Sequence, residues 1–302
     1  MLMLKRIFLT FLAIIFAIIS FAVVAVQYQR QPEVLVVTDD IGHELQFFEL
    51  PKRLVVLEPG VGYLLEQWRR QHLAVATSDE LVALFPRAEN LGSASDITVL
   101  QIAATRPDLV IAGARDRELA KKLRQSGFPV LMVAPNRLER LLAWPETLGT
   151  LVSASRYAKQ SAQQLEKQLA EYKQASAESP GAGQRVLWFA DEQFTAAGAN
   201  TLEADLIELV SAANAIGGKN GYTTVELKDI LATTATVIIA PETIMPTIES
   251  QLPQPVSLDG EVPERPSLVL LPVGEKPISW DNIFTYADWL QDNLLPSEPV
   301  AE

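Results

Sequence analysis

The sequence predicts an α/β protein of two Rossmann-like lobes that are joined by one long backbone helix, with a ligand cleft between the lobes. Three observations carry this prediction. Short apolar runs alternate with amphipathic segments along the 302 residues, as in parallel sheets that are covered by helices. One helix-to-strand unit occurs twice. Between the two copies lies a stretch with the apolar period of a single long helix.

The first lobe, residues 31–143, is expected to contain four buried strands and two helices. The strands are the apolar runs at 53–59, 72–78, 109–112 and 128–135. The helix before the third strand should be capped by Ser95 or Asp96, and it must end before Pro107, which cannot continue a helix. The helix before the fourth strand should end at Gly127.

The connection between the lobes is predicted to be one helix over residues 144–178. Its apolar or near-apolar positions are separated by alternating steps of three and four residues, which is the period of one helix face. These positions are Leu148, Leu151, Ser155, Ala158, Ala162, Leu165, Leu169 and Tyr172. The phrase AESPGAGQ then reads as a loop.

The second lobe, residues 179–302, is expected to repeat the plan of the first. Its predicted strands and helices lie at 185–190, 201–214, 224–234, 236–241, 267–273 and 279–294, of which the first, fourth and fifth are strands. The run Leu109–Ala112 aligns with Val237–Ala240 at an offset of 128 residues, and Ile102 then aligns with Ile230. The agreement in order favours a repeat over chance.

The first 30 residues are predicted to be a signal peptide or an N-terminal membrane anchor. Lys5 and Arg6 precede the uncharged, mostly apolar residues 7–26, a run long enough to span a bilayer. Small residues at 20–22 and 23–25 also fit a cleavage site, so both fates stay open. In either case the remainder should be periplasmic. Taking the three bases of this segment from a net charge of −12 leaves −15 for the exported part.

Composition and motifs argue against several classes of protein. The net charge of −12 is opposite in sign to the basic face of a nucleic-acid-binding protein. Cysteine is absent, and the two histidines, His43 and His72, have no ligand-like spacing. There is no Gly-x-Ser-x-Gly elbow, no phosphate loop and no Gly-x-Gly-x-x-Gly. We therefore expect no enzyme, no catalytic residue, no cofactor, no metal site and no nucleic-acid partner.

The candidate ligand-binding residues follow from strand ends, because ligands of such sheets bind outside the carboxyl ends of the strands. The set combines aromatic rings with a few polar groups, which suits a bulky, partly apolar ligand. Its members are Pro59, Gly60, Tyr63, Ser95, Asp96, Arg115, Glu192, Phe194, Asn220, Tyr222 and Trp280.

Four phrases of the sequence carry a resemblance to a known family. They are VTDDIGHELQFFELPKRLVVLEPGVGYLLEQ, LGSASDITVLQIAATRPDLVIAG, LRQSGFPVLMVAP and AAGANTLEADLIELVSAANAIGGKNGYTTVELKDILATTATVIIA. In this order they resemble the periplasmic substrate-binding proteins of ABC importers for iron-siderophores, haem and cobalamin. The resemblance runs from about residue 37 to 295. It implies a monomeric, extracytoplasmic protein that captures one such small-molecule chelate for an ABC permease in the inner membrane.

The resemblance also bears on single residues. Some haem-binding members of the family use tyrosine as an iron ligand, which points to Tyr63 or Tyr222 if the ligand is haem. Arg115 is expected to pair with a carboxylate or an anionic iron chelate. The family usually places a glutamate on each lobe to dock the permease, but the matching positions here are Leu100 and Lys228. The alternative function is therefore a membrane-tethered sensing or assembly protein on the same fold.

Overall fold

The computed structural model of the protein describes residues 12, 14–21, 34–175, 181–252, 265–271, 278 and 282–294. The first lobe is built on a parallel five-stranded sheet with the strand order β5-β4-β3-β6-β7. The strands are β3 (Leu54–Val56), β4 (Ala74–Thr77), β5 (Glu89–Asn90), β6 (Leu109–Ala112) and β7 (Val130–Met132). The sheet is accompanied by the helices α2 (Pro59–Gln67), α3 (Val99–Thr105) and α4 (Arg117–Gln125). An antiparallel hairpin, β1 (Leu35–Thr38) and β2 (Glu44–Phe47), precedes them.

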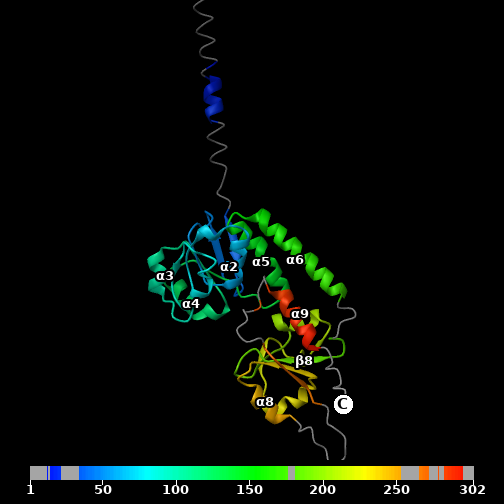
Figure 1. Ribbon diagram of the computed structural model, residues 1–302. Coiled ribbons are helices and arrows are strands. Elements are labelled where there is room, and N and C mark those ends of the chain that lie inside the picture. The colour runs from blue at the N-terminus through cyan, green and yellow to red at the C-terminus, as the bar shows by residue number, and fades with distance from the viewer. Residues whose placement is uncertain are drawn as a thin grey trace, which may run out of the picture.

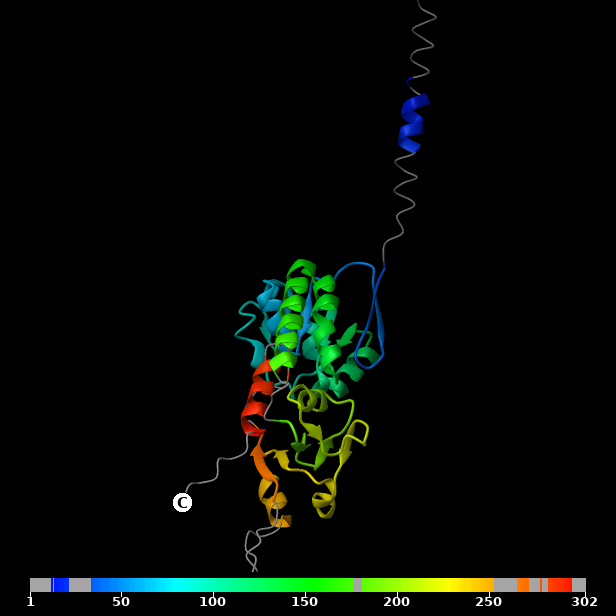
Figure 2. The ribbon, with the colours of Figure 1, turned by 90° about the vertical axis from the view of Figure 1, so that its right-hand side faces the viewer.

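The second lobe lies below the first in both views of the molecule (Figures 1 and 2) and has a smaller parallel sheet. Its strand order is β10-β8-β12-β13. These strands are β8 (Arg185–Trp188), β10 (Ala213–Asn214), β12 (Val237–Ala240) and β13 (Ser267–Leu270). A separate antiparallel pair joins β9 (Thr195–Ala197) to β11 (Tyr222–Thr224), and the helices are α7 (Leu202–Leu209), α8 (Met245–Gln251) and α9 (Ile283–Leu294).

The predicted repeat is visible in the topology of the two sheets. Strand β6 lies between β3 and β7, and strand β12 lies between β8 and β13. All four residues of each of these two strands are buried, as expected for inner strands of a parallel sheet. Ile102 and Ile230, which align at the same offset, are also buried.

The predicted single helix over 144–178 is wrong in one respect: this stretch belongs to two helices. The chain forms α5 (Leu138–Leu151), leaves helical geometry at Ser153, where φ is +52°, and forms α6 (Ser155–Ala175). The two helices pack side by side as a hairpin (Figures 1 and 2). The apolar period continues across the turn because both helices present their apolar stripe to the same core.

The close approach of α5 and α6 depends on a glycine. A Cβ atom at Gly149 would lie only 2.2 Å from the Cβ of Ala158. No side chain fits there without moving one helix away from the other. The turn and the close contact together explain why a continuous sequence pattern produces a hairpin instead of a rod.

Two local predictions also need correction. The N-cap of α3 is Thr98, and neither Ser95 nor Asp96 fills that position. Thr98 and Gln101 form a capping box, which satisfies two backbone N–H groups at once. In the second lobe, the helix predicted over 224–234 is replaced by two short 3-10 turns, Leu227–Asp229 and Leu231–Thr233.

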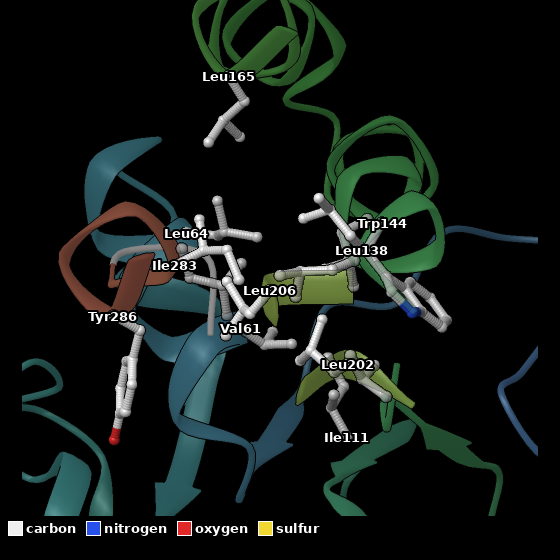
Figure 3. Close-up of a cluster of buried hydrophobic side chains, with 14 of the residues drawn as sticks. Val61, Leu64, Ile111, Leu138, Trp144, Leu165, Leu202, Leu206, Ile283 and Tyr286 are labelled. Atoms are coloured by element: carbon white, nitrogen blue, oxygen red, sulfur yellow. The ribbon is translucent and has the colours of Figure 1, made fainter. Parts of the chain in front are cut away.

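One hydrophobic cluster runs through both lobes. Figure 3 shows its central side chains, which come from α2, β6, α5, α6, α7 and α9. Val61 and Ile111 of the first lobe are part of the same cluster as Leu202 and Leu206 of the second. A smaller cluster covers the other face of the first sheet, and another covers the other face of the second. The lobes are therefore joined by buried apolar surface as well as by the chain.

The predicted N-terminal segment, residues 7–26, falls largely outside the described residues. Among the residues that the structure describes, no helix has both the length and the apolar character needed to cross a bilayer.

Candidate functional site

The carboxyl edge of the first sheet faces the second lobe, and Arg137 marks the contact. Arg137 follows β7, and its Nε donates hydrogen bonds to both carboxylate oxygens of Asp205 at 3.0 and 2.8 Å. Its Nη1 donates to Oδ1 of Asn200 at 2.6 Å. The Asp205 carboxylate also accepts the backbone N–H of Leu138 at 2.7 Å and so satisfies the first turn of α5. The strand ends beside β7 therefore lie where ligands of such folds bind.

Glu58 is the first charged residue at this edge. It lies just beyond the end of β3, after Leu57, and caps α2, with its Oε1 accepting the backbone N–H of Gly60 at 3.1 Å. The side chain is partly buried. Burial raises the pKa of Glu58 from 4.5 to about 7, and the N–H of Gly60 offsets only part of that effect.

The Glu58 carboxyl occupies space that a glycine leaves open. A Cβ atom at Gly113, which follows β6, would lie 2.2 Å from Oε2 of Glu58. The strand ends of β3 and β6 are therefore in contact through this carboxyl. Because the pKa of Glu58 is about 7, the group can donate or accept a hydrogen bond to a ligand near neutral pH.

Arg115 lies at the end of β6 and is held by an acid. Its Nη1 and Nη2 donate to the two oxygens of Glu80 at 2.9 and 2.6 Å, a bidentate pair. The neighbouring Asp116 is buried and accepts the N–H of Gly113 at 2.8 Å, and desolvation raises its pKa. The charge of Arg115 is thus already engaged by Glu80, which weakens the expectation that it pairs with an anionic ligand.

Ser78 adds a buried hydroxyl to the same edge. It follows β4, the strand beside β3, and is fully buried. Its Oγ makes no hydrogen bond within the part of the chain that the structure describes. We call the residues Glu58, Ser78, Glu80, Arg115 and Asp116 the first-lobe cluster.

The second lobe has its own polar group of residues, which we call the second-lobe cluster: Asn200, Glu203, Asn220 and Tyr222. The hydroxyl of Tyr222 donates to Oε2 of Glu203 at 2.8 Å, and Nδ2 of Asn200 donates to Oδ1 of Asn220 at 2.7 Å. Desolvation raises the pKa of Glu203, and desolvation together with Glu203 raises the pKa of Tyr222. Through Asn200, the cluster is linked to Arg137.

The remaining sequence candidates lie in several places. Pro59 and Gly60 are buried in the first turn of α2. Tyr63 lines a cavity of about 430 Å³ between α2, α6 and α9. Ser95 lines a different cavity of about 320 Å³, which it shares with Arg115.

The last candidates flank these sites. Asp96 is exposed and its carboxylate accepts the hydroxyl of Ser95 at 3.3 Å. Glu192 is exposed. Phe194 packs edge-on against Phe189 with ring centroids 5.8 Å apart. Trp280 lies outside the described residues. The two tyrosines considered as haem ligands, Tyr63 and Tyr222, belong to separate groups of residues.

The sequence prediction missed several members of the two clusters, and for most of them a signal existed. Glu58 and Ser78 lie at the carboxyl ends of the strands predicted at 53–59 and 72–78, so the strand-end rule that selected Pro59 also applied to them. Glu203 had no such signal, because its role comes from a contact with Tyr222. Within the described residues, no group of three or more histidine or acidic side chains could hold a metal ion.

The comparisons with known proteins agree with the fold. The family model for periplasmic binding proteins matches residues 72–247, more than half of the chain. No curated protein matches the chain. Three solved structures of the same fold are similar over most of their length.

An Fe3+-hydroxamate transport protein from Saccharomonospora viridis is 16% identical, with a TM-score of 0.64, and the match covers 86% of this chain and 98% of that one. A vitamin B12 binding protein of Vibrio cholerae is 17% identical, with a TM-score of 0.60 and coverage of 81% and 96%. A haem-binding protein from Pseudomonas aeruginosa is 16% identical, with a TM-score of 0.58 and coverage of 83% and 96%. With its two α/β lobes and its match to the family model, the chain belongs to the periplasmic binding protein family.

Proposed function

We propose that this protein captures an iron-siderophore, haem or cobalamin outside the cytoplasm and delivers it to an ABC importer, without catalysis of its own. The observation that carries the proposal is the pairing of the family match with a polar strand edge that faces the second lobe. The names of the similar structures supply the ligand class, because they bind hydroxamate-chelated iron, vitamin B12 and haem. We propose that the ligand contacts the first-lobe and second-lobe clusters.

Within this class, we propose that neutral or cationic chelates bind better than anionic ones. The first-lobe cluster has three carboxyl groups and one guanidinium, and Glu80 already pairs with that guanidinium at 2.6 Å. An anionic ligand would meet Asp116 and, above about pH 7, an ionised Glu58, and like charges at close range repel. A ligand with amide or hydroxyl donors would instead find acceptors on Glu58 and Asp116.

We expect the importer to dock without the glutamate on each lobe that the resembled family usually uses. Leu100 is 82% exposed on α3, so this position offers an apolar side chain to a partner. Lys228 is exposed and pairs with Glu226 at 2.6 Å. We propose that the partner permease recognises these lobes through residues other than an acidic pair.

Thermal denaturation of residues 31–302 with a ligand panel tests the proposed function. The panel contains haem, cyanocobalamin, a cationic ferric trihydroxamate and an anionic ferric catecholate, each with its iron-free form as a control where one exists. A ligand at a hundred times its Kd should add about 2.7 kcal/mol to the free energy of unfolding and raise the Tm by a few degrees. We expect the neutral or cationic chelates to give the largest shift. If none of the four shifts the Tm, chelate capture is wrong.

The fate of residues 7–26 needs its own measurement. Intact mass of the protein from membrane and periplasmic fractions distinguishes a cleaved signal peptide from a retained anchor, because removal of the segment lowers the mass by more than 2 kDa. Gel filtration with light scattering tests the proposed monomer.

A further inference from the structure

A second concave surface lies away from the strand edge, between the helices that join the lobes. It is a groove of about 890 Å³ between α5, α6 and α7, within the size range of ligand-binding sites. Its apolar lining comes from Leu138, Leu142, Ala143, Ala162, Leu169 and Leu209. Leu142 and Leu169 are only partly buried, so the groove exposes apolar surface to solvent. Of its residues, Arg137, Leu138 and Asp205 take part in the polar contacts described above.

The rim of the groove is acidic. Glu139, Glu146, Glu166 and Glu208 line it, and all four side chains are exposed. None of the four makes a salt bridge within the part of the chain that the structure describes. Asp205 also lines the groove, but Arg137 neutralises it. Lys173 is the other basic residue of the lining. The groove therefore combines an apolar floor with an excess of negative charge.

We propose that this groove docks a cationic amphipathic helix of a partner protein. Its lining residues extend over 138–146 on α5 and 162–173 on α6, which is about 12 to 17 Å of helix at 1.5 Å per residue. A docked helix of two to three turns fits that length. Its apolar positions at i, i+3 or i+4 and i+7 would contact Leu142, Leu169 and Leu209, and its lysines or arginines would meet the four glutamates.

Charge excludes the other occupants. A bilayer with anionic headgroups would be repelled by the acidic rim. A second copy of the exported part has a net charge of −15, so self-association through this groove is opposed as well. The segment 253–264 of the same chain has three acidic residues and no base, and it is repelled for the same reason.

A designed peptide tests the proposal on the full-length protein. The probe is a fluorescently labelled 14-residue helix with leucine at i, i+3, i+7 and i+10 and lysine at most other positions. The first control peptide has the same composition in scrambled order, and the second replaces every lysine by glutamate. We expect saturable binding of the probe by fluorescence anisotropy, weaker binding at higher salt, and no binding of either control.

Matched variants place the binding site. Combining Glu139→Gln, Glu146→Gln and Glu166→Gln should weaken probe binding about tenfold. Glu171 lies on α6, as Glu166 does, but outside the groove lining. Glu171→Gln should therefore leave probe binding unchanged. Leu169→Ser should weaken binding without loss of the folded state, which circular dichroism checks.

Three results would overturn the proposal: equal binding of the scrambled peptide, an equal loss with Glu171→Gln, or displacement of the probe by a small amphiphilic cation such as decyltrimethylammonium. The last result would make the groove a small-ligand site. The groove variants should keep the Tm shift caused by the chelate, so this proposal and the proposed chelate capture can fail independently.

Discussion

The aligned units of the two lobes contain matching strands, β6 and β12, but the segments that precede these strands differ in structure. Before β6, the chain forms the regular helix α3, fixed at its start by the Thr98–Gln101 capping box and tied to Leu91 O by the Gln101 amide at 3.1 Å. Before β12, the corresponding residues form only 3-10 turns. The N-cap position there is Glu226, whose side chain makes no capping bond.

The difference lies at the start of the two units, because they end in the same way. In the second lobe, the hydroxyl of Thr233 donates to the carbonyl of Ile230 at 2.6 Å, and Thr234 takes a left-handed conformation with φ of +52°. In the first lobe, the hydroxyl of Thr105 donates to the carbonyl of Ile102 at 2.8 Å, and Arg106 has φ of +49°. Both lobes therefore bury the same isoleucine and strand positions, but only the first lobe, which has the capping box, forms a regular helix before the strand.

The largest effect is expected from the two aligned isoleucines. Their substitution tests whether the segments before β6 and β12 contribute equally to the stability of the core. Ile102→Ala and Ile230→Ala should each lower the free energy of unfolding by about 2 to 5 kcal/mol, since both side chains are buried. Ile102→Ala should cost more, because the capped helix cannot collapse into the cavity. Urea denaturation of both variants measures this. A larger loss for Ile230→Ala would contradict the view that α3 is the more rigid copy.

Glu58 sharpens the comparison through pH, because burial raises the pKa of this carboxyl at the edge of the first sheet. Its pKa is about 7 in the folded protein and 4.5 in the unfolded chain, so the folded state holds the proton more tightly. The contribution of this group to stability is present below pH 4.5 and is lost as the pH rises through 7. At pH 8, Glu58→Gln should therefore be more stable than the wild type by at most about 3 kcal/mol.

Unfolding of the wild type and Glu58→Gln between pH 5 and pH 8 measures this difference. Glu203→Gln in the second-lobe cluster is the matched control, because desolvation raises the pKa of Glu203 too. We expect its curve to change in the same direction as that of Glu58→Gln, since the pKa of the replaced carboxyl is raised in both cases. Parallel curves for the wild type and Glu58→Gln would show that Glu58 is ionised throughout.

A substitution at Gly149 tests whether destabilisation at the α5–α6 contact spreads to both lobes. Gly149→Ala places a Cβ atom 2.2 Å from that of Ala158 and should cost about 1 to 3 kcal/mol. Since one hydrophobic cluster joins the lobes, hydrogen exchange should accelerate in both β6 and β12. Gly218→Ala, which meets no atom within 4 Å, is the control. Faster exchange in only one strand would mean that the lobes open separately.

The smallest expected effect concerns the caps themselves. Thr98→Ala removes a side chain that accepts the N–H of Gln101 and should cost about 1 kcal/mol. Glu226→Ala removes no capping bond, so its effect should be smaller. Thermal denaturation at neutral pH measures both variants. Equal losses would show that the cap does not explain the difference between the two units.

The sequence predicted the fold well where buried runs are short and bounded. The stretch Leu109–Ala112 has its predicted strand ends because Pro107 stops the preceding helix and all four side chains are buried. The α5–α6 hairpin was not predictable from periodicity, because a turn at Ser153 leaves the apolar spacing unchanged. The site was less predictable. Glu58 could be found from its place after a strand, whereas the Tyr222–Glu203 contact joins segments whose proximity only the folded chain creates.

The β1–β2 hairpin depends on residues far downstream. The carboxylate of Asp39 accepts the N–H groups of Ile41 and His43 locally, but also that of Met132 at 3.2 Å, and it pairs with Arg124. Asp40 accepts the N–H of Ala134 at 2.6 Å and the indole N–H of Trp144 at 2.8 Å.

A chain that emerges N-terminus first can pair β1 with β2, but it cannot form these contacts until about a hundred further residues have followed. Until then, the two carboxylates lack their downstream partners. The hairpin is therefore expected to dock late in folding, because the contacts that hold it to the lobe close long loops of the chain.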